Sequence, residues 1–335
     1  MEHIKNVTMR DIAQSMNVSV TTISKVINGH KDISERTKTE VWDKIHEMGY
    51  VPNIMAANLR RNKGNVVALL LSDISQPYFS RVIHGYERVL NAAGYHTMIF
   101  SSMEQGEHET VLLKQIASMN IAGVIIDPAY NSDPEKKALK QVGIPYVFSN
   151  RFLDADKDYY VAADNEAAGY IATKHLLERK PVYPVFCVNG PERISPTIKR
   201  YAGYCRAMEE AGVSIETSWV LDNNFDLLDA YKAGLHIAER AKGSCSVFCS
   251  TDQLAIGVMR ALKDKGLSVP GDVGVIGVDD IDMAAYLTPA LTTVALPKEQ
   301  IGEQTAKILI ELMAGNKVKQ PRLLLEPKLT LRETT

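Results

Sequence analysis

The chain has 335 residues, of which 45% are hydrophobic and 23% are charged, the composition of an ordinary globular protein. This length is too great for one small core and predicts two or three domains. The longest uninterrupted apolar run, Val66–Leu71, is too short to cross a membrane. The N-terminus begins with charged residues and lacks the apolar core of a secretory signal. We therefore expect a cytoplasmic protein without a membrane partner.

Charge is distributed unevenly along the chain. Residues 1–63 carry ten basic and seven acidic side chains, a net charge of +3, so the rest of the chain must carry −5 to give the total of −2. A basic head on an acidic body indicates contact with nucleic acid at the N-terminal end alone.

Four cysteines, Cys187, Cys205, Cys245 and Cys249, are spaced too irregularly for a zinc framework or a disulfide scaffold. We expect buried, reduced thiols. No dinucleotide-binding, phosphate-loop or metalloprotease motif follows any strand-like run, so we assign no catalytic residue, no metal and no cofactor. A catalytic triad assembled in space would leave no such motif, and an enzyme on an α/β scaffold stays an alternative.

The first fifty residues predict three short helices, each with a polar cap. Thr8 and Asp11 form a capping box for the first helix, which stops at Asn17, a residue that tolerates left-handed backbone. Ser19 caps the second helix and Ser34 caps the third. Two short helices joined by so tight a turn form a helix-turn-helix, whose second helix is the natural reader of the DNA major groove.

These helices are also amphipathic. Their apolar positions point inward and are Ile12, Ala13, Met16, Ile23, Val26, Ile27, Val41, Trp42, Ile45 and Met48. The outward face of the second helix is made of Val20, Thr21, Thr22, Ser24, Lys25 and Asn28. A three-helix bundle with no role in DNA binding would show the same periodicity, so the periodicity leaves that alternative open.

The sequence of the head identifies a family. Val-Thr-Met-Arg-Asp-Ile-Ala at 7–13, Asn-Val-Ser-Val-Thr-Thr-Ile-Ser-Lys-Val-Ile-Asn-Gly at 17–29 and Gly-Tyr-Val-Pro-Asn at 49–53 closely resemble the head of the LacI/GalR family of repressors. The resemblance continues over almost the whole chain. In the head it implies DNA contacts by Thr8, Val20, Thr21, Thr22, Ser24, Lys25, Asn28, Ser34, Thr37 and Tyr50. The family usually has arginine where this chain has Lys25, which can contact guanine as a flexible point charge.

A hinge is expected after the head. Pro52 breaks the preceding element, and Ile54–Arg60 is helix-compatible but too short to be stable alone. In the family this segment orders against its symmetry mate in the minor groove, where a leucine from each subunit wedges into a base step. The resemblance places Leu59 as that wedge, with Asn53 and Ala56 as neighbouring DNA contacts. A buried linker leucine is the alternative for Leu59.

From Asn65 onward, β-rich runs alternate with helical stretches. The runs are Val66–Leu71, Thr97–Ser101, Gly123–Asp127, Tyr146–Ser149, Val185–Val188, Ser246–Cys249, Val273–Val278 and Thr292–Ala295. This alternation predicts parallel sheets with helices on both faces, and its length predicts two lobes that exchange strands, as in periplasmic sugar-binding proteins and this family's regulatory domain.

The expected fold class is therefore α/β. An all-α helix-turn-helix head spans residues 1–50, a hinge helix and linker span 51–64, and a two-lobed, periplasmic-binding-protein-like parallel α/β sensor domain for effector binding and dimerisation spans 65–335. We expect the lobes at 65–163 plus 293–322 and at 164–292 plus 323–335.

An effector pocket is expected between the lobes, where the strands end in polar side chains. The resemblance makes Arg200, in Arg-Tyr-Ala-Gly-Tyr, the residue that grips the ligand. The full expected set is Asp73, Tyr78, Phe79, Asn150, Arg151, Asp164, Arg200, Phe225, Asp252 and Asp279. Asp164 could instead cap a helix, Asp252 could hold a loop, and a structural role is favoured over ligand contact for Asp73 and Asp280. We expect Arg200 and Asp279 to be exposed at the mouth of the cleft.

This set of arginine, carboxylate, amide and aromatic groups is typical of a sugar site. Lys298 stands at a position where the resemblance implies an aromatic residue that packs on the ligand, and it would suit a sugar acid or a sugar phosphate if it faced the cleft. We thus expect a homodimeric repressor that binds a pseudo-palindromic DNA operator under the control of a sugar, sugar acid or sugar phosphate. A solute-binding protein of a transporter is the alternative that the sensor alone would fit.

Overall fold

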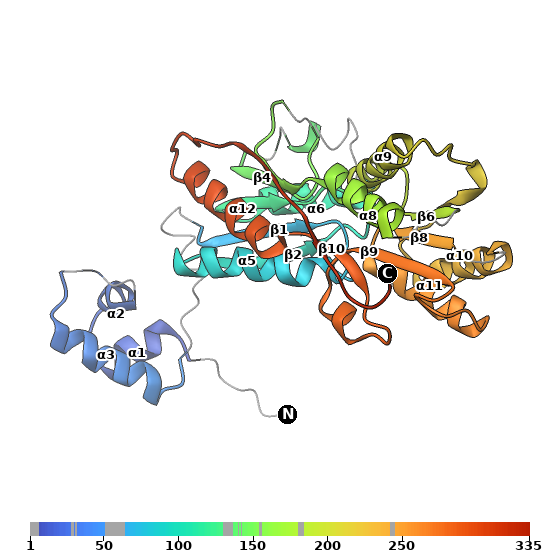
Figure 1. Ribbon diagram of the computed structural model, residues 1–335. Helices are drawn as coiled ribbons and strands as arrows, with labels where there is room; N and C mark the ends of the chain where they lie inside the picture. The colour runs from blue at the N-terminus through green and yellow to red at the C-terminus, as the bar shows by residue number, and fades with distance from the viewer. Residues whose placement is uncertain are drawn as a thin grey trace. The chain divides into compact units, whose positions relative to one another are not determined.

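The computed structural model describes residues 7–27, 30, 32–50, 64–129, 137–139, 141, 143–153, 156–179, 184–241 and 245–335. The chain divides into two compact units, Met1–Gly64 and Asn65–Thr335 (Figure 1). Among the residues that the structure describes, no helix is long and apolar enough to span a lipid bilayer.

The N-terminal unit contains three short helices, α1 (Met9–Ser15), α2 (Val20–Ile27) and α3 (Glu35–Glu47). The expected caps are confirmed: Thr8 and Asp11 form a reciprocal capping box, and the Ser19 and Ser34 hydroxyls accept from backbone amides three residues on, at 3.0 and 3.2 Å. Asn17 has a φ of 51°, the left-handed turn that ends α1. The helix-turn-helix predicted from the sequence is therefore present.

The core of this unit is small. It consists of the buried residues Ile12, Ala13, Ile23, Val26, Val41 and Ile45, with Met16, Ile27, Met48 and Tyr50 packed partly buried against it. The prediction that Trp42 points inward was wrong, because its side chain is 37% exposed. Val41, Ile45 and Met48 already form the inward stripe of α3, and Trp42 lies one position, about 100°, beyond it, close to His46.

The C-terminal unit has two six-stranded sheets. The first contains β1 (Val66–Leu71), β2 (His96–Ser101), β3 (Gly123–Ile126), β4 (Tyr146–Ser149), β5 (Tyr160–Ala163) and β11 (Arg322–Leu325), in the order β11-β5-β4-β3-β1-β2. The second contains β6 (Val185–Asn189), β7 (Val220–Asp222), β8 (Cys245–Cys249), β9 (Val273–Asp279), β10 (Thr292–Ala295) and β12 (Lys328–Thr330), in the order β12-β10-β9-β8-β6-β7. All pairs are parallel except β10 with β12. The predicted two-lobed α/β class is confirmed.

The chain passes between the sheets slightly later than expected. β10 belongs to the second sheet although residues 293–295 were expected in the first lobe, and β11 belongs to the first sheet although residues 323–325 were expected in the second. Strands β5, β7, β11 and β12 are each only three or four residues long and were not predicted. Periodicity is a weak signal in runs this short, and β3, β4 and β10, which also have four residues, were predicted while these four were not.

Helices cover both faces of each sheet. In the first, α5 (Tyr78–Ala92) and α12 (Lys298–Met313) pack on one face and α6 (Gly106–Ser118) on the other. In the second, α8 (Asn165–Arg179) and α9 (Ser195–Glu210) pack on one face and α10 (Leu227–Arg240) and α11 (Asp252–Asp264) on the other. Short 3-10 helices span Thr217–Trp219 and Asp282–Tyr286.

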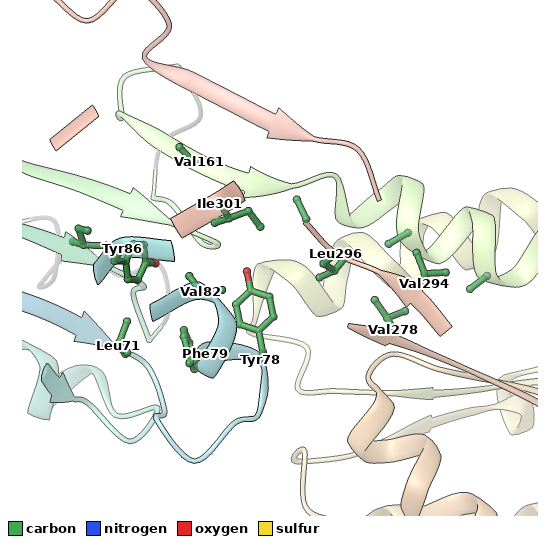
Figure 2. Packing of buried hydrophobic residues seen from close by; sticks show 14 of the residues in the cluster. Leu71, Tyr78, Phe79, Val82, Tyr86, Val161, Val278, Val294, Leu296 and Ile301 are labelled. Atoms are coloured by element: carbon green, nitrogen blue, oxygen red, sulfur yellow. The ribbon is translucent and has the colours of Figure 1, made fainter. Parts of the chain in front are cut away.

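One apolar core continues from the first sheet into the second. Figure 2 shows Tyr78 and Phe79 at the start of α5 beside Leu71 and Val82, while Leu296 leads toward Val278 and Val294 of the second sheet. The lobes are thus joined by packed side chains as well as by the connecting chain.

Glycine pairs allow the covering helices to cross closely. A Cβ on Gly169 of α8 would overlap the carbonyl oxygen of Arg200, and one on Gly203 of α9 would overlap that of Glu166. Arg200 lies one turn before Gly203, so this crossing sets the position of its side chain. Gly85 and Gly302 serve the same purpose between α5 and α12.

The close crossing of α8 and α9 predicts whether replacing Gly169 stabilises or destabilises the protein. In an open helix, Gly→Ala stabilises by about 0.5–1 kcal/mol. We expect Gly169→Ala instead to destabilise the sensor by about 1–3 kcal/mol, because the new methyl group must push α9 away. Scanning calorimetry of the wild type and the variant measures this difference. A higher melting temperature in the variant would show that the helices do not touch at Gly169.

Candidate functional site

The outward face of α2 is the candidate DNA-reading surface of the head. Val20 and Thr21 are exposed, and Thr22 and Lys25 are half-buried along the same helix. The Lys25 ammonium pairs with Asp32 at 2.5 Å. This hydrogen bond lowers the pKa of the Asp32 carboxyl, which keeps its negative charge beside Lys25. To contact a base, Lys25 would have to give up its ion pair with Asp32.

The other residues expected at DNA occupy helix ends or lie outside the described ranges. Thr8 is in the capping box of α1, Ser34 and Thr37 share a hydrogen bond of 2.8 Å at the start of α3, and Tyr50 is half-buried against the head core. Asn28, Asn53, Ala56 and Leu59, and with them the expected hinge, fall on residues that the structure does not describe.

Arg200 is the centre of the polar site in the sensor. Its Nε donates to Asn165 Oδ1 at 2.9 Å, one terminal nitrogen donates to the carbonyl of Ser250 at 2.5 Å, and the other pairs with Asp279 at 3.2 Å. Arg200 and Asp279 are only 5% and 6% exposed. The expectation that they lie exposed at the cleft mouth was therefore wrong, because the guanidinium ties together α8, β8 and β9.

The segment after β9 has strained backbone. Asp279 and Asp280 have φ angles of 115° and 52°, a region that non-glycine residues seldom adopt. The Lys298 ammonium donates to the carbonyls of both residues. Lys298 is itself buried, so the expectation that it could face the cleft as a free cation was wrong. It comes from α12 of the first lobe and holds the strained turn of the second.

A second polar cluster belongs to the first lobe. Arg151 makes a bidentate ion pair with Glu104 at 2.7 and 2.8 Å and also donates to the carbonyls of Pro128 and Ala129. Asn150, with a φ of 64°, donates to Asp127 at 3.0 Å. Burial raises the pKa of the Asp127 carboxyl, and the positive charge of Arg151 opposes that rise.

These two clusters face each other across a cavity of about 50 Å³, which we call the effector cavity. Of the expected effector residues it is lined by Tyr78, Phe79, Asn150, Arg151, Arg200, Phe225 and Asp279. Among the described atoms, the Tyr78 hydroxyl and Asn150 Oδ1 have no hydrogen-bond partner. A cavity of ~150 Å³ can hold benzene, and this one is about a third of that volume, so a ring-sized ligand fits only if the lobes move apart.

Three expected effector residues do not line this cavity. Asp73 accepts from Ser75 and Gln76 in its own loop, and Asp164 caps α8 through the Ala167 amide at 2.9 Å. Asp252 is fully buried and accepts from the Ile281 amide at 2.9 Å and from the Thr293 hydroxyl. All three carboxyl groups hold backbone or loops, which is the structural alternative that the sequence left open for each of them.

Sequence reasoning missed several residues at the cavity. Gln76, Glu104, Ile194, Pro196 and Thr251 also line it. Glu104 lies in the turn before α6, and only its distant partner Arg151 brings it to the site. The alternation of strands and helices carries no signal for such a pairing. Gln76 and Thr251, by contrast, follow β1 and β8 and could have been included by the strand-end rule.

All four cysteines are free thiols, and burial raises the pKa of Cys187, Cys245 and Cys249. In the described part of the chain, no three metal-ligating side chains gather at one place.

Known proteins resemble this chain along its length. Residues 8–53 match the family model of the bacterial regulatory proteins of the lacI family, and residues 173–335 match that of the periplasmic binding protein-like domain. The HTH-type transcriptional repressor PurR of Vibrio campbellii is 30% identical over 328 residues, 98% of each chain. The structure of the transcriptional regulator CelR with cellobiose is 28% identical, with a TM-score of 0.76 over 98% of this chain and 100% of that one. The Lac repressor dimer bound to operator and an anti-inducer shares the fold, with 21% identity and a TM-score of 0.86 over 99% of both chains.

The burial of the Asp252 carboxyl predicts that the stability of the fold depends on pH. Burial raises the pKa of its carboxyl from 3.8 to about 8, and the Asp279 carboxylate adds to the rise. The stability that Asp252 contributes is therefore complete below its ordinary pKa of 3.8 and is lost as the pH rises toward 8. We expect Asp252→Asn, which stays neutral, to lose this part of the slope between pH 4 and about 8.

Melting temperatures of the wild type and Asp252→Asn across that pH range measure the effect. Asp264→Asn is the control, since Asp264 is exposed and its carboxyl has a lowered pKa. The same pH slope in the wild type and Asp252→Asn would contradict a protonated Asp252 in the folded chain.

Proposed function

Because the chain belongs to the LacI family of bacterial regulatory proteins, we propose that it is a cytoplasmic, homodimeric repressor without enzyme activity, controlled by a neutral sugar. That it is a DNA-binding transcription regulator follows from the family and from the helix-turn-helix head. A solute-binding protein of a transporter is not favoured, since the head has no place in such a protein.

The choice of a neutral effector rests on how the cations of the effector cavity are paired. Arg200 pairs with Asp279, and Arg151 makes a bidentate ion pair with Glu104. Lys298 does not line the cavity and donates to the carbonyls of Asp279 and Asp280. An acid or phosphate would need a cation that has no such partner, because adding a further negative charge to a buried, balanced cluster is costly. A hydroxyl group can both donate and accept, and it inserts into these pairs without changing their charge.

The walls of the effector cavity also suit a sugar ring. Tyr78, Phe79 and Phe225 provide flat apolar surfaces on which the C–H face of a pyranose can pack. Asp279 accepts from hydroxyl groups at the ring edge, and Arg200 donates to them. The partnerless Tyr78 hydroxyl and Asn150 Oδ1 supply one further donor and one acceptor. The relative CelR, whose complex contains cellobiose, is a precedent for a carbohydrate effector in this fold.

The effector acts by fixing the angle between the lobes. Tyr78, Phe79, Asn150 and Arg151 belong to the first lobe, and Arg200, Phe225 and Asp279 belong to the second. A ligand that contacts both sets stabilises one lobe arrangement over another by its differential affinity. In a homodimer this change reaches two heads, each of which reads one half of a pseudo-palindromic operator.

Asp279→Asn tests the sugar site. The amide keeps an acceptor for Arg200 but loses one acceptor for a ligand hydroxyl and the charge that balances the guanidinium, so we expect a folded protein of lower stability that binds operator and has lost about 1–3 kcal/mol of sugar affinity. Calorimetric titration with the sugars that raise the melting temperature in a screen measures the loss. Asp264→Asn, which removes the same charge at an exposed residue that pairs within α11, is the matched control.

Unchanged sugar affinity in Asp279→Asn would place the effector elsewhere. Arg200→Ala is a less suitable test of the sugar site, because it leaves the buried Asp279 carboxylate unpaired.

Lys25→Ala tests base reading by α2. If Lys25 contacts a base, its removal costs about 1–3 kcal/mol at one base pair of each half-site and relaxes the preference there. Selection of palindromic DNA from a random library by the wild type and the variant measures that preference. Lys44→Ala is the control, since Lys44 pairs with Glu47 on α3. Equal weakening toward all sequences in Lys25→Ala would reduce Lys25 to a phosphate contact.

A further inference from the structure

A second hollow adjoins the effector cavity. It has a volume of about 370 Å³ and is lined from the first lobe by Phe152, Ala163 and Leu324 and from the second by Ala167, Pro196 and Lys199, among others. We call it the flank groove. Its volume lies within the range of small-molecule sites, ~300–1,000 Å³, whereas the effector cavity is far smaller.

The two hollows share a wall. Asn150 and Pro196 line both of them. Asn150 follows β4 of the first lobe and Pro196 begins α9 of the second, so the wall consists of one residue from each lobe. Any separation of the lobes that lets a ring into the effector cavity also widens the passage between Asn150 and Pro196. Asn150 Oδ1 is buried and no other described group contacts it by a hydrogen bond, so it would become available as an acceptor if the lobes separated here.

The flank groove has apolar walls. Phe152 stacks on Tyr160 with ring centroids 3.9 Å apart, and Leu324 on the edge strand β11 is 55% exposed. Ala162, Ala163 and Ala167 leave room between them. An exposed leucine beside an aromatic ring and three alanines favours a ligand group with an apolar face.

The charges at the rim of the groove are balanced. Glu166 accepts from Lys199 at 3.5 Å and from Arg206 at 3.2 Å, and Asp164 is the carboxylate that caps α8. Two cations thus face two carboxylates. The groove has no excess of positive charge that would select an anion, and its polar rim suits a group with hydroxyls at its edge.

We propose that the effector is a two-ring glycoside, with its first ring in the effector cavity and its second ring in the flank groove. This inference rests on the proposed neutral sugar effector and adds the size of the molecule. The passage between Asn150 and Pro196 takes the glycosidic bond. No contact between the second ring and the Arg200 cluster is required, so the two rings contribute separately to affinity.

Calorimetric titration of the full-length protein tests the proposal. Glucose, galactose, mannose and xylose are each compared with their phenyl glycosides and with disaccharides that carry them at the non-reducing end. We expect at least one glycoside to bind about tenfold or more tighter than its parent monosaccharide, the gain that a further buried ring provides.

Two variants test whether the flank groove is the source of the higher affinity for the glycoside. Ala167→Phe fills the flank groove from the first turn of α8, and we expect it to remove the gain while monosaccharide binding stays unchanged. Leu324→Ala removes an apolar wall from an exposed residue, so it does not threaten folding, and we expect it to reduce the gain several-fold. Ala167→Ser and Leu331→Ala are the matched controls, since Leu331 is 58% exposed and lies outside the groove.

Equal affinity for monosaccharides and glycosides would contradict the binding of a second ring, while the proposal of a sugar effector would stand. A glycoside gain that survives both Ala167→Phe and Leu324→Ala would overturn the flank groove as its location. Binding of none of these neutral sugars would contradict the proposed function itself and this inference with it.

Discussion

A buried guanidinium at the junction of three chain segments is the constraint on which the sensor depends. Arg200 joins the start of α8, the end of β8 and the end of β9 through Asn165, Ser250 and Asp279. It can do so because Gly169 and Gly203 allow α8 and α9 to cross with their backbones in contact. The side chains that organise the second lobe are therefore also those that a ligand between the lobes would meet. A ligand that competes for Asp279 or Arg200 acts on the architecture of the lobe directly.

The link between the lobes is equally specific. Asp279 and Asp280 hold left-handed backbone at a cost of order 1–3 kcal/mol each, and Lys298 from α12 of the first lobe stabilises the turn through both carbonyls. On the outer surface, Arg81 of α5 pairs with Asp282 of the second lobe at 3.0 Å. Together with the apolar core that continues through Leu296 (Figure 2), these contacts make the relative position of the lobes a property of a few named groups.

Much of the fold could be predicted from the sequence, because local signals decide it. Thr8, Ser19 and Ser34 start helices through hydrogen bonds to their own neighbours, and Asn17 ends one through its backbone preference. The strand runs follow from consecutive apolar residues in sheets covered on both faces. Trp42 was misplaced because an apolar residue at the edge of a helical stripe fits the periodicity as well as one at its centre.

The site was less accessible to sequence reasoning, because its members acquire their environment only in three dimensions. Tyr78, Phe79, Asn150, Arg151, Arg200, Phe225 and Asp279 were expected together, and they surround one cavity. The burial of Arg200 and Asp279, the engagement of Lys298 by two carbonyls and the pairing of Arg151 with Glu104 depend on contacts between distant segments. The proposal of a neutral sugar rests on the two cations that line the cavity among the described residues, since Arg151 pairs with Glu104 and Arg200 with Asp279.

The most direct test is the operator affinity of the full-length protein, measured by fluorescence anisotropy on a palindrome that the protein itself selects. The measurement is made with a saturating neutral sugar and then with the corresponding sugar acid and 6-phosphate. Control by a neutral sugar predicts that such a sugar changes operator affinity by about tenfold or more, within the range of allosteric couplings, while its charged derivatives have little effect. A change produced by the acid or the phosphate but not by the neutral sugar would contradict it.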